Sequence, residues 1–392
     1  MTLNAIEILR DMIAIPSVNP MRAESGLPVE GQLGDYIEST LRLSGIDCER
    51  QSVAEGRDNI IAVVQASGGN HKHDGLMLNS HLDTVPVVNM AIDPFDPVVR
   101  DGRIYGRGAC DAKGSIAAMM AALVGHVSQP HRPVPIVFAA MVDEEFSFRG
   151  SWEFIKRGWP VSACVVGEPT KLVSVIAHKG IARWMVRVTG TSAHGAMPHL
   201  GHSAIYDGAR VALALEAYAQ DLCTRTPHPL LGTSTLNVGR VAGGSAVNIV
   251  PDSCEFEVEL RLLPGEDARE AMRDCEERVR KCVGEEVRFV VNEPYLVDPA
   301  LDTPREAAIV RAVGEAHQAE FGSANAIEGA YYCTDASKLA RAGIETMVCG
   351  PGDIAQAHTC DEFIEIEQVE KAVRLYSRLI ESWPITFGHA GT

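Results

Sequence analysis

Histidines and acidic residues follow the apolar segments of this sequence, where they could hold divalent metal ions. They are His81 and Asp83 after residues 75–80, Glu144 and Glu145 after residues 134–142, Glu168 after residues 161–167, and His358 eight residues beyond residues 346–350. Imidazole and carboxylate ligands suit zinc, cobalt or manganese, and the absence of thiolates from the set argues against a structural zinc site.

One further acid, Asp111, stands in a glycine-rich loop over residues 106–114 (GRGACDAKG). With Glu144, Glu145 and Glu168 it brings more negative charge than one divalent ion requires. Crowded carboxylates without a metal would repel one another and raise one another's pKa. Two ions bridged by one carboxylate, ~3.5–4 Å apart, would resolve this repulsion.

The first 175 residues predict the elements that position these side chains. The short apolar runs at 75–80, 134–142 and 161–167 are typical of strands buried on both faces, as in a largely parallel sheet. Residues 112–126 predict a buried helix, and residues 1–20 an amphipathic helix with Ile6, Leu9, Met12 and Ile13 on one face. This half is therefore an open α/β sheet, whose carboxyl strand ends are where ligands bind.

The pattern changes over residues 179–292. It predicts strand 181–189, helix 203–219, strands 234–241 and 254–262, helix 266–283 and strand 286–291. In 254–262 apolar residues alternate with charged ones, which indicates a sheet with one buried and one wet face. The order matches a ferredoxin-like α+β domain, inserted with its own core.

From residue 293 the first pattern returns. Thr303-Pro304-Arg305-Glu306 predicts a helix start, with a capping threonine, a proline at the first helical position and a glutamate three residues after the threonine. The sequence thus predicts a discontinuous catalytic domain, 1–178 plus 293–392, around the inserted domain 179–292.

Composition excludes several classes of protein. The net charge is −17, so nucleic acid and anionic membranes are not expected partners. No apolar run approaches the length of a membrane span, and the N-terminus lacks the pattern of a signal peptide. The ten cysteines are scattered and form no C-x-x-C pair, which favours reduced thiols in a cytoplasmic protein.

Each motif also has a structural explanation of its own. A His-x-Asp pair can be a cap, an Asp-Glu-Glu run an exposed helix start, and a Gly-Glu-Pro stretch a turn. Their occurrence at successive strand ends favours a common site. No Gly-x-Ser-x-Gly elbow, Cys-His pair or complete dinucleotide-binding glycine motif supports another chemistry.

Together these stretches resemble the M20 metallopeptidase family, especially its branch of acetylornithine deacetylase and succinyl-diaminopimelate desuccinylase. The matching motifs are SHLDTVP (80–86), YGRG through DAKG (105–114), DEE (143–145), GEP (167–169) and His358. The family often reads Asp-Met-Lys-Gly or Asp-Asp-Lys-Gly where this chain has Ala112. Since alanine contacts no metal, the bridging role of Asp111 should survive.

The resemblance implies a di-zinc peptidase-like catalytic domain holding two Zn²⁺, with Co²⁺ or Mn²⁺ as substitutes. It implies that Asp111 bridges both ions, that His81 and Glu168 complete one, and that Glu145 and His358 complete the other. It also implies that Asp83 orients His81 and that Glu144 is the general base for the water between the ions.

The inserted segment resembles the lid or dimerisation domain of that family, which implies a homodimer. His194 matches a histidine that stabilises the oxyanion, Asn248 a substrate-contacting asparagine, and Arg261 a position that binds the substrate carboxylate. Arg261 also fits a charge on the wet face of its strand. Gly350, Gly352 and Thr334-Asp335 resemble loops that line the pocket.

The implied activity is hydrolysis of the amide of an N-acyl amino acid, in amino-acid biosynthesis, by a deacetylase or desuccinylase. A dipeptidase or carboxypeptidase acting on short peptides or folate-type amides is the alternative within the family. A metal-binding protein without catalysis is a third reading. It is disfavoured because Glu144 and all five ligand positions are present.

Overall fold

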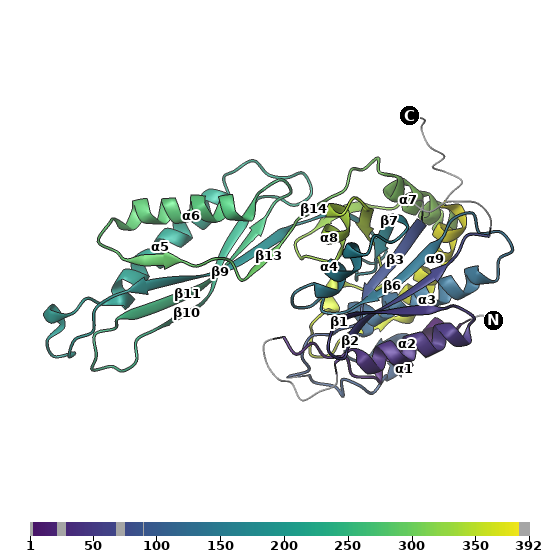
Figure 1. Ribbon diagram of the computed structural model, residues 1–392, viewed down its shortest axis with the longest axis horizontal. Helices are drawn as coiled ribbons and strands as arrows, with labels where there is room; N and C mark the ends of the chain where they lie inside the picture. Colours follow the sequence, from purple (N-terminus) through teal and green to yellow (C-terminus); the bar gives the residue numbers. More distant parts are fainter. Residues whose placement is uncertain (1–2, 22–28, 68–74, 89, 384–392) are drawn as a thin grey trace. The chain divides into compact units, whose positions relative to one another are not determined.

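Residues 3–21, 29–67, 75–88 and 90–383 are described by a computed structural model (Figure 1). Contacts divide the chain into unit 1, made of Met1–Ile176, Thr303–Glu328 and Thr334–Thr392, and unit 2, made of Ala177–Asp302 and Gly329–Cys333. The sequence placed the return to the first unit at residue 293. Residues up to Asp302 stay with unit 2 because β13 (Leu296–Asp298) pairs with β9 (Gly180–Thr189).

A mixed sheet forms the centre of unit 1, in the order β1-β2-β6-β3-β7-β16-β8, with β14 and β15 also paired to β8. The central strands β6, β3, β7 and β16 are parallel to one another, as predicted. The flanking strands β1, β2 and β8 pair antiparallel. The strands are β1 (Cys48–Ala54), β2 (Arg57–Val64), β3 (Gly75–His81), β6 (Ile136–Met141), β7 (Val161–Val166), β8 (Ser174–His178), β14 (Leu301–Asp302), β15 (Ile327–Ala330) and β16 (Glu345–Val348).

Apolar side chains explain why the central strands lie in the interior. Every residue of β3 and β6 is buried, so continuous apolar runs rather than alternation mark these strands. The helix α3 (Gly114–Val127) is buried along nearly its whole length and packs against α9 (Ile366–Ser382). The remaining helices of unit 1 are α1 (Ala5–Ile13), α2 (Gly31–Leu43), α4 (Arg149–Lys156), α7 (Ala308–Phe321) and α8 (Ala336–Arg341), with short helical turns at Ala109–Lys113 and Ile354–Gln356.

A small second sheet connects two distant parts of unit 1. Its strands are β4 (Val99–Arg100), β5 (Arg103–Tyr105) and β17 (Phe363–Glu365), in the order β17-β5-β4. The antiparallel pairing of β17 with β5 joins the segment that follows His358 to the glycine-rich loop that carries Asp111.

The helix predicted to start at Thr303 begins five residues later, at Ala308, so this prediction was wrong. The Thr303 hydroxyl donates to the Thr346 carbonyl instead of capping a helix. The Thr303 amide donates to the Ile176 carbonyl at 2.8 Å. Thr303 therefore belongs to the sheet region, and residues 304–307 form a turn before α7.

Unit 2 has the β-α-β-β-α-β order predicted from the sequence. Its elements are β9, α5 (Ala204–Leu222), β10 (Thr235–Gly243), β11 (Ser253–Leu262), α6 (Ala268–Val283), β12 (Phe289–Val291) and the additional β13, with a 3₁₀ turn at Pro198–Leu200. The sheet order is β10-β11-β9-β12, and the pairs are antiparallel.

One face of this sheet forms the core of unit 2. Buried and partly exposed residues alternate along β11 as the sequence predicts, and Phe256 and Val258 pack in one apolar cluster with Trp184, Leu215 and Met272. The solvent-exposed face carries ion pairs between β9 and β11, such as Arg187–Glu255 at 2.6 Å. No helix within the described ranges of the chain is long and apolar enough to cross a membrane.

Candidate active site

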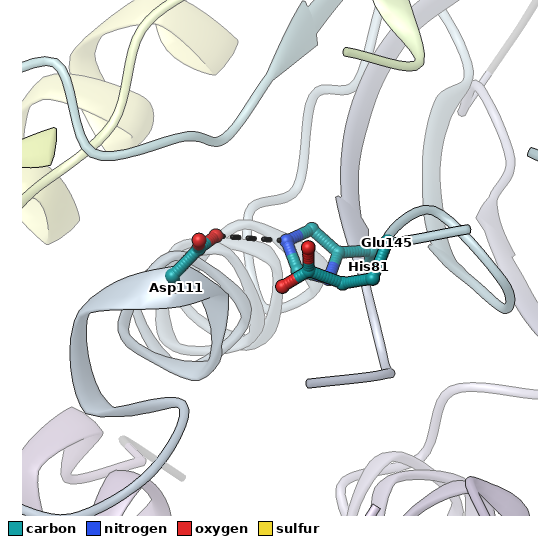
Figure 2. A group of neighbouring side chains, drawn as sticks. All are labelled: His81, Asp111 and Glu145. Carbon is teal, nitrogen blue, oxygen red and sulfur yellow. Dashed lines mark hydrogen bonds and ion pairs between the residues drawn. The ribbon is translucent and has the colours of Figure 1, made fainter. Parts of the chain in front are cut away.

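His81, at the end of β3, lies between two acids. Its Nε2 is 3.1 Å from Asp111 Oδ1 and 3.7 Å from Glu168 Oε2, and its Nδ1 is 2.8 Å from the backbone carbonyl of Asp83. Figure 2 shows the imidazole directed at Asp111, with Glu145 beside it. Ligand atoms of His81, Asp111 and Glu145 all lie within 4.8 Å of one another.

The other oxygen of Asp111 faces the second histidine. Asp111 Oδ2 is 3.2 Å from His358 Nε2, and the same nitrogen is 3.2 Å from Glu145 Oε2. Asp111 therefore stands between two histidine–carboxylate groups, one on each of its oxygens. His358 adopts a left-handed backbone conformation with φ 63°, which is rare outside glycine and is often found at functional sites.

These spacings fit metal coordination. Ligand atoms around one tetrahedral ion with bonds of about 2.1 Å lie about 3.4 Å from one another. The measured separations of 3.1 and 3.7 Å on the His81 side, and of 3.2 Å on the His358 side, bracket that value. The buried Glu168 Oε1 has no hydrogen-bond partner in the described structure, which an ion at this position would supply. The donor set therefore fits two divalent ions.

Burial and crowding shift the pKa of these groups in the direction expected for a charge-dense site. Burial and the charge of Asp111 raise the pKa of Glu145 to about 7. Burial also raises the pKa of Glu168 to about 7, although the His81 charge lowers it. Hydrogen bonds to Asp111 and Glu145 raise the pKa of His358 to about 10. The pKa values of both the acids and the imidazole are raised, as expected where negative charge is concentrated.

Glu144, the predicted general base, is buried next to this cluster. Burial and the charge of Glu168 raise its pKa well above the usual range. The charge of Asp335 also raises it, and burial raises the pKa of Asp335 itself to about 6. The motif Thr334-Asp335 thus places an acid near Glu144 and this cluster.

Asp83 contacts the loop of the two glutamates more closely than it contacts His81. Its Oδ1 accepts the Glu144 amide and its Oδ2 accepts the Glu145 amide, each at 3.0 Å. The Asp83 carboxylate is 3.6 Å from His81 Nδ1, so the nearest partner of that nitrogen is the Asp83 backbone carbonyl. The sequence predicted that Asp83 orients His81, and the structure adds that it fixes the backbone of residues 144–145.

A buried polar network behind Asp83 escaped the sequence analysis. Asn19 donates to Asp83 Oδ2 at 2.8 Å and to Asp143 Oδ1 at 3.0 Å. Arg57 pairs with Asp143 at 3.0 Å and with Glu30. Asp143 has φ 66°, so these contacts hold a left-handed residue directly before the two glutamates. Asn19, Glu30 and Arg57 stand in no motif of the sequence, so no local signal indicated them.

The two glycines predicted to line the pocket lie against the backbone of the cluster. A side chain at Gly350 would come within 2.5 Å of the Glu168 carbonyl. Gly352 has φ 93°, and a side chain there would meet Cys110 Sγ at 2.6 Å. Both positions therefore require glycine for close packing, and contact with a substrate remains a prediction.

The other predicted residues belong to unit 2. His194 and Asn248 lie in adjacent loops, because His194 forms a β-bridge with Ile249 and the Gly195 amide donates to the Asn248 carbonyl at 2.7 Å. Both residues are exposed. Arg261 lies apart from them at the end of β11, and its Nε donates to Glu259 at 2.8 Å.

Comparison with known proteins identifies relatives along nearly the whole chain. Residues 77–382 match peptidase family M20/M25/M40. An acetylornithine deacetylase of Myxococcus xanthus is 32% identical over 357 residues, covering 88% of this chain and 90% of the relative. An acetylornithine deacetylase of Vibrio cholerae is 30% identical over 390 residues, covering 96% and 98%.

Among solved structures, the fold is similar to that of the Bacillus subtilis YXEP protein, described as a dinuclear metal binding peptidase from the M20 family. The TM-score is 0.71 at 17% sequence identity, and the match covers 97% of this chain and 98% of that one.

Proposed function

The chain belongs to peptidase family M20/M25/M40 and is a hydrolase of amide bonds, and we propose that it removes the acyl group from an N-acyl amino acid. The observation that carries the proposal is the position of Asp111. Its two oxygens face His81 and His358 at 3.1 and 3.2 Å, so that one carboxylate is shared by two ligand groups. Relatives named acetylornithine deacetylase over most of the chain favour an N-acetylated amino acid as substrate.

Two zinc ions would be held at this site, with cobalt or manganese as substitutes. His81, Asp111 and Glu168 would hold one, and Asp111, Glu145 and His358 the other. When bound, the ions would polarise the amide carbonyl and lower the pKa of water for attack at neutral pH. The nitrogen and oxygen donors of the set fit each of these metals.

Glu144 would act as general base and then deliver the proton to the leaving amine. It is buried beside the ligand groups, and burial together with the charge of Glu168 raises its pKa, which favours uptake of a proton. Glu145 differs in role because its carboxylate pairs with His358. Asp83 would hold Glu144 and Glu145 in different orientations, since one of its oxygens accepts the backbone amide of Glu144 and the other accepts that of Glu145.

Unit 2 would supply recognition of the substrate. Arg261 would bind the substrate carboxylate, Asn248 would contact the substrate, and His194 would donate to the oxyanion. Gly350 and Gly352 would line the pocket within unit 1, where a side chain at Gly350 would meet the Glu168 carbonyl and one at Gly352 would meet Cys110 Sγ.

We also propose a homodimer through unit 2. The edge strand β10 and the helix α5 expose large apolar side chains, with Tyr206 75% and Leu213 66% exposed on α5 and Val241 61% exposed on β10. An unpaired edge beside apolar surface is suited to pairing with a second copy. Sedimentation of the wild type and of Leu213→Asp tests this, and equal monomer mass for both would refute it.

Cysteine usage supports a cytoplasmic location. All ten cysteines are free, although six of them are buried where a thiol is protected from exchange. A reducing compartment is where unpaired cysteines of this number are usual.

Hydrolysis of a small substrate panel tests the activity. Acetylornithine, acetylmethionine, succinyl-diaminopimelate and several dipeptides would be assayed with added zinc or cobalt and again after chelation. We expect metal-dependent release of the free amine from one N-acyl amino acid. Turnover of dipeptides alone would assign the chain to the peptidases of the family, and protein that binds no metal would refute the proposed site.

A further inference from the structure

Glu362 is a fully buried acid that belongs to no motif used above. Its Oε1 accepts the amides of Cys110 and Asp111 at 2.9 and 3.0 Å. Its Oε2 accepts the amide of Gly108 at 3.0 Å and a guanidinium N–H of Arg107 at 2.7 Å. One carboxylate thus binds three backbone amides of the loop that ends at Asp111.

The same short segment carries a predicted metal ligand. Glu362 lies four residues after His358 and directly before β17, whose pairing with β5 continues in a bond from the Gly106 amide to the Glu362 carbonyl at 3.0 Å. The backbone of residues 106–111 is therefore fixed against the segment of His358 from both its β5 end and its Asp111 end.

From this arrangement we propose that Glu362 is a positioning residue of the metal centre. By holding the Asp111 backbone, it sets the Asp111 carboxylate so that one oxygen faces His81 and the other faces His358. The inference rests on the two-ion site proposed above. Amides that donate to an ionised carboxylate form strong bonds, and Glu362 supplies the acceptor at the start of the helical turn Ala109–Lys113, where the first N–H groups of a helix have no partner within it.

A second explanation is that Glu362 only neutralises the buried Arg107. In that case the ion pair would contribute to stability, and the amide contacts would follow from it. The two explanations differ in whether loss of the amide contacts, as in Glu362→Gln, disturbs the metal site. The glutamine NH₂ would face either the amides of Cys110 and Asp111 or that of Gly108, and N–H groups facing one another cannot bond.

The test compares Glu362→Gln with two controls. Arg107→Gln removes the ion pair and keeps the carboxylate on the amides. Glu365→Gln changes an exposed acid of the adjacent strand β17. Each full-length protein, freed of metal by chelation, would be titrated with Co²⁺ by calorimetry, and its visible absorption and far-ultraviolet circular dichroism recorded.

We expect Glu362→Gln to keep the wild-type dichroism, to bind Co²⁺ about 10–100-fold more weakly and to show an altered Co²⁺ absorption band. Glu365→Gln should match the wild type, and Arg107→Gln should lose less affinity than Glu362→Gln. A folded Glu362→Gln with unchanged affinity and absorption would overturn the proposal, as would an equal loss in Arg107→Gln.

Failure of the metal site itself would look different. Wild-type protein that binds no Co²⁺ would refute the two-ion site, and with it the role of Glu362. If Glu362→Gln does not fold, Glu362→Asp decides, because it keeps the charge and withdraws the carboxylate by one methylene. We expect a loss of affinity there as well, and wild-type affinity in a folded Glu362→Asp would overturn the proposal.

Discussion

Replacing Asp83 by asparagine should separate the two roles of this residue, which are to orient His81 and to hold the backbone of Glu144 and Glu145. One side-chain oxygen becomes an NH₂ group. If the remaining oxygen took the place of Oδ1, the NH₂ would face both the Glu145 amide and the Asn19 side chain. The less costly orientation keeps the oxygen toward that pair and points the NH₂ at the Glu144 amide. Asp83→Asn therefore removes the acceptor of the Glu144 backbone amide and keeps the acceptor of the Glu145 backbone amide.

The magnitude follows from one buried amide left without an acceptor. Such a loss costs about 1–3 kcal/mol in the free energy of unfolding. Changes around an active-site ligand set typically reduce activity about 10–100-fold, and we expect that loss in kcat because Glu144 is displaced. Affinity for metal should change less, since His81 Nδ1 is held at 2.8 Å by the backbone carbonyl of Asp83, which the substitution keeps.

Denaturant unfolding of the metal-free proteins, Co²⁺ titration and turnover of an N-acetyl amino acid at saturating metal measure these quantities separately. Asp47→Asn is a suitable control, because Asp47 is fully exposed. Wild-type kcat in Asp83→Asn would refute the reasoning. Loss of metal with normal turnover per bound ion would instead show that Asp83 acts mainly through His81.

Three further outcomes are expected. Glu144→Gln should keep its metal and lose turnover ~10²–10⁴-fold, the usual contribution of a general base, and metal analysis beside a turnover assay would check both. Glu145→Gln should weaken binding of one ion and leave the other, since its carboxylate pairs with His358 but the His81 group remains; metal content that equals the wild type would contradict this. The contribution of His126 to stability should fall as pH drops below about 6.5, because burial, with the charge of Arg132, lowers the pKa of His126 and the unfolded chain then takes up the proton first. His126→Leu should flatten this pH dependence in denaturant unfolding, and an unchanged slope would exclude His126 as its source.

The central strands of the sheet could be predicted because they are mostly apolar. Residues 75–80 and 134–142 contain few polar side chains, and β3 and β6 are buried on both faces. The acids and imidazoles that follow these strands then had to lie at one edge of the sheet. Of the predicted ligands, His81, Asp111, Glu145, Glu168 and His358 do lie together in the structure.

Contacts between distant segments could not be predicted from local pattern. Thr303 satisfies every sequence rule for a capping residue, yet its hydroxyl is bonded to Thr346, 43 positions along the chain. Glu362 reads as one acid among several near the C-terminus, and its partners lie more than 250 positions earlier. The antiparallel pairing of the flanking strands likewise depends on chain order and has no signal in the strands themselves.

Two buried carboxylates, Asp83 and Glu362, hold the ligand loops by accepting backbone amides. Each also has a cationic neighbour, His81 for the first and Arg107 for the second, so part of its charge is compensated within the protein. Amide contacts of this kind form without any ion, and they reduce the rearrangement that metal binding would otherwise require.

The two carboxylates also draw on different parts of unit 1. Asp83 reaches the Glu144 amide across 61 positions within the first part of unit 1, so that part of the cluster needs only the chain that precedes unit 2. Glu362 accepts the Asp111 amide from 251 positions later in the chain, and His358 lies in the same segment as Glu362. The contact of Glu362 with the backbone of the shared ligand Asp111 therefore joins the two parts of unit 1 that lie on either side of unit 2 in the sequence. A complete site requires both parts of unit 1, so metal binding by the full chain reports that the two have joined.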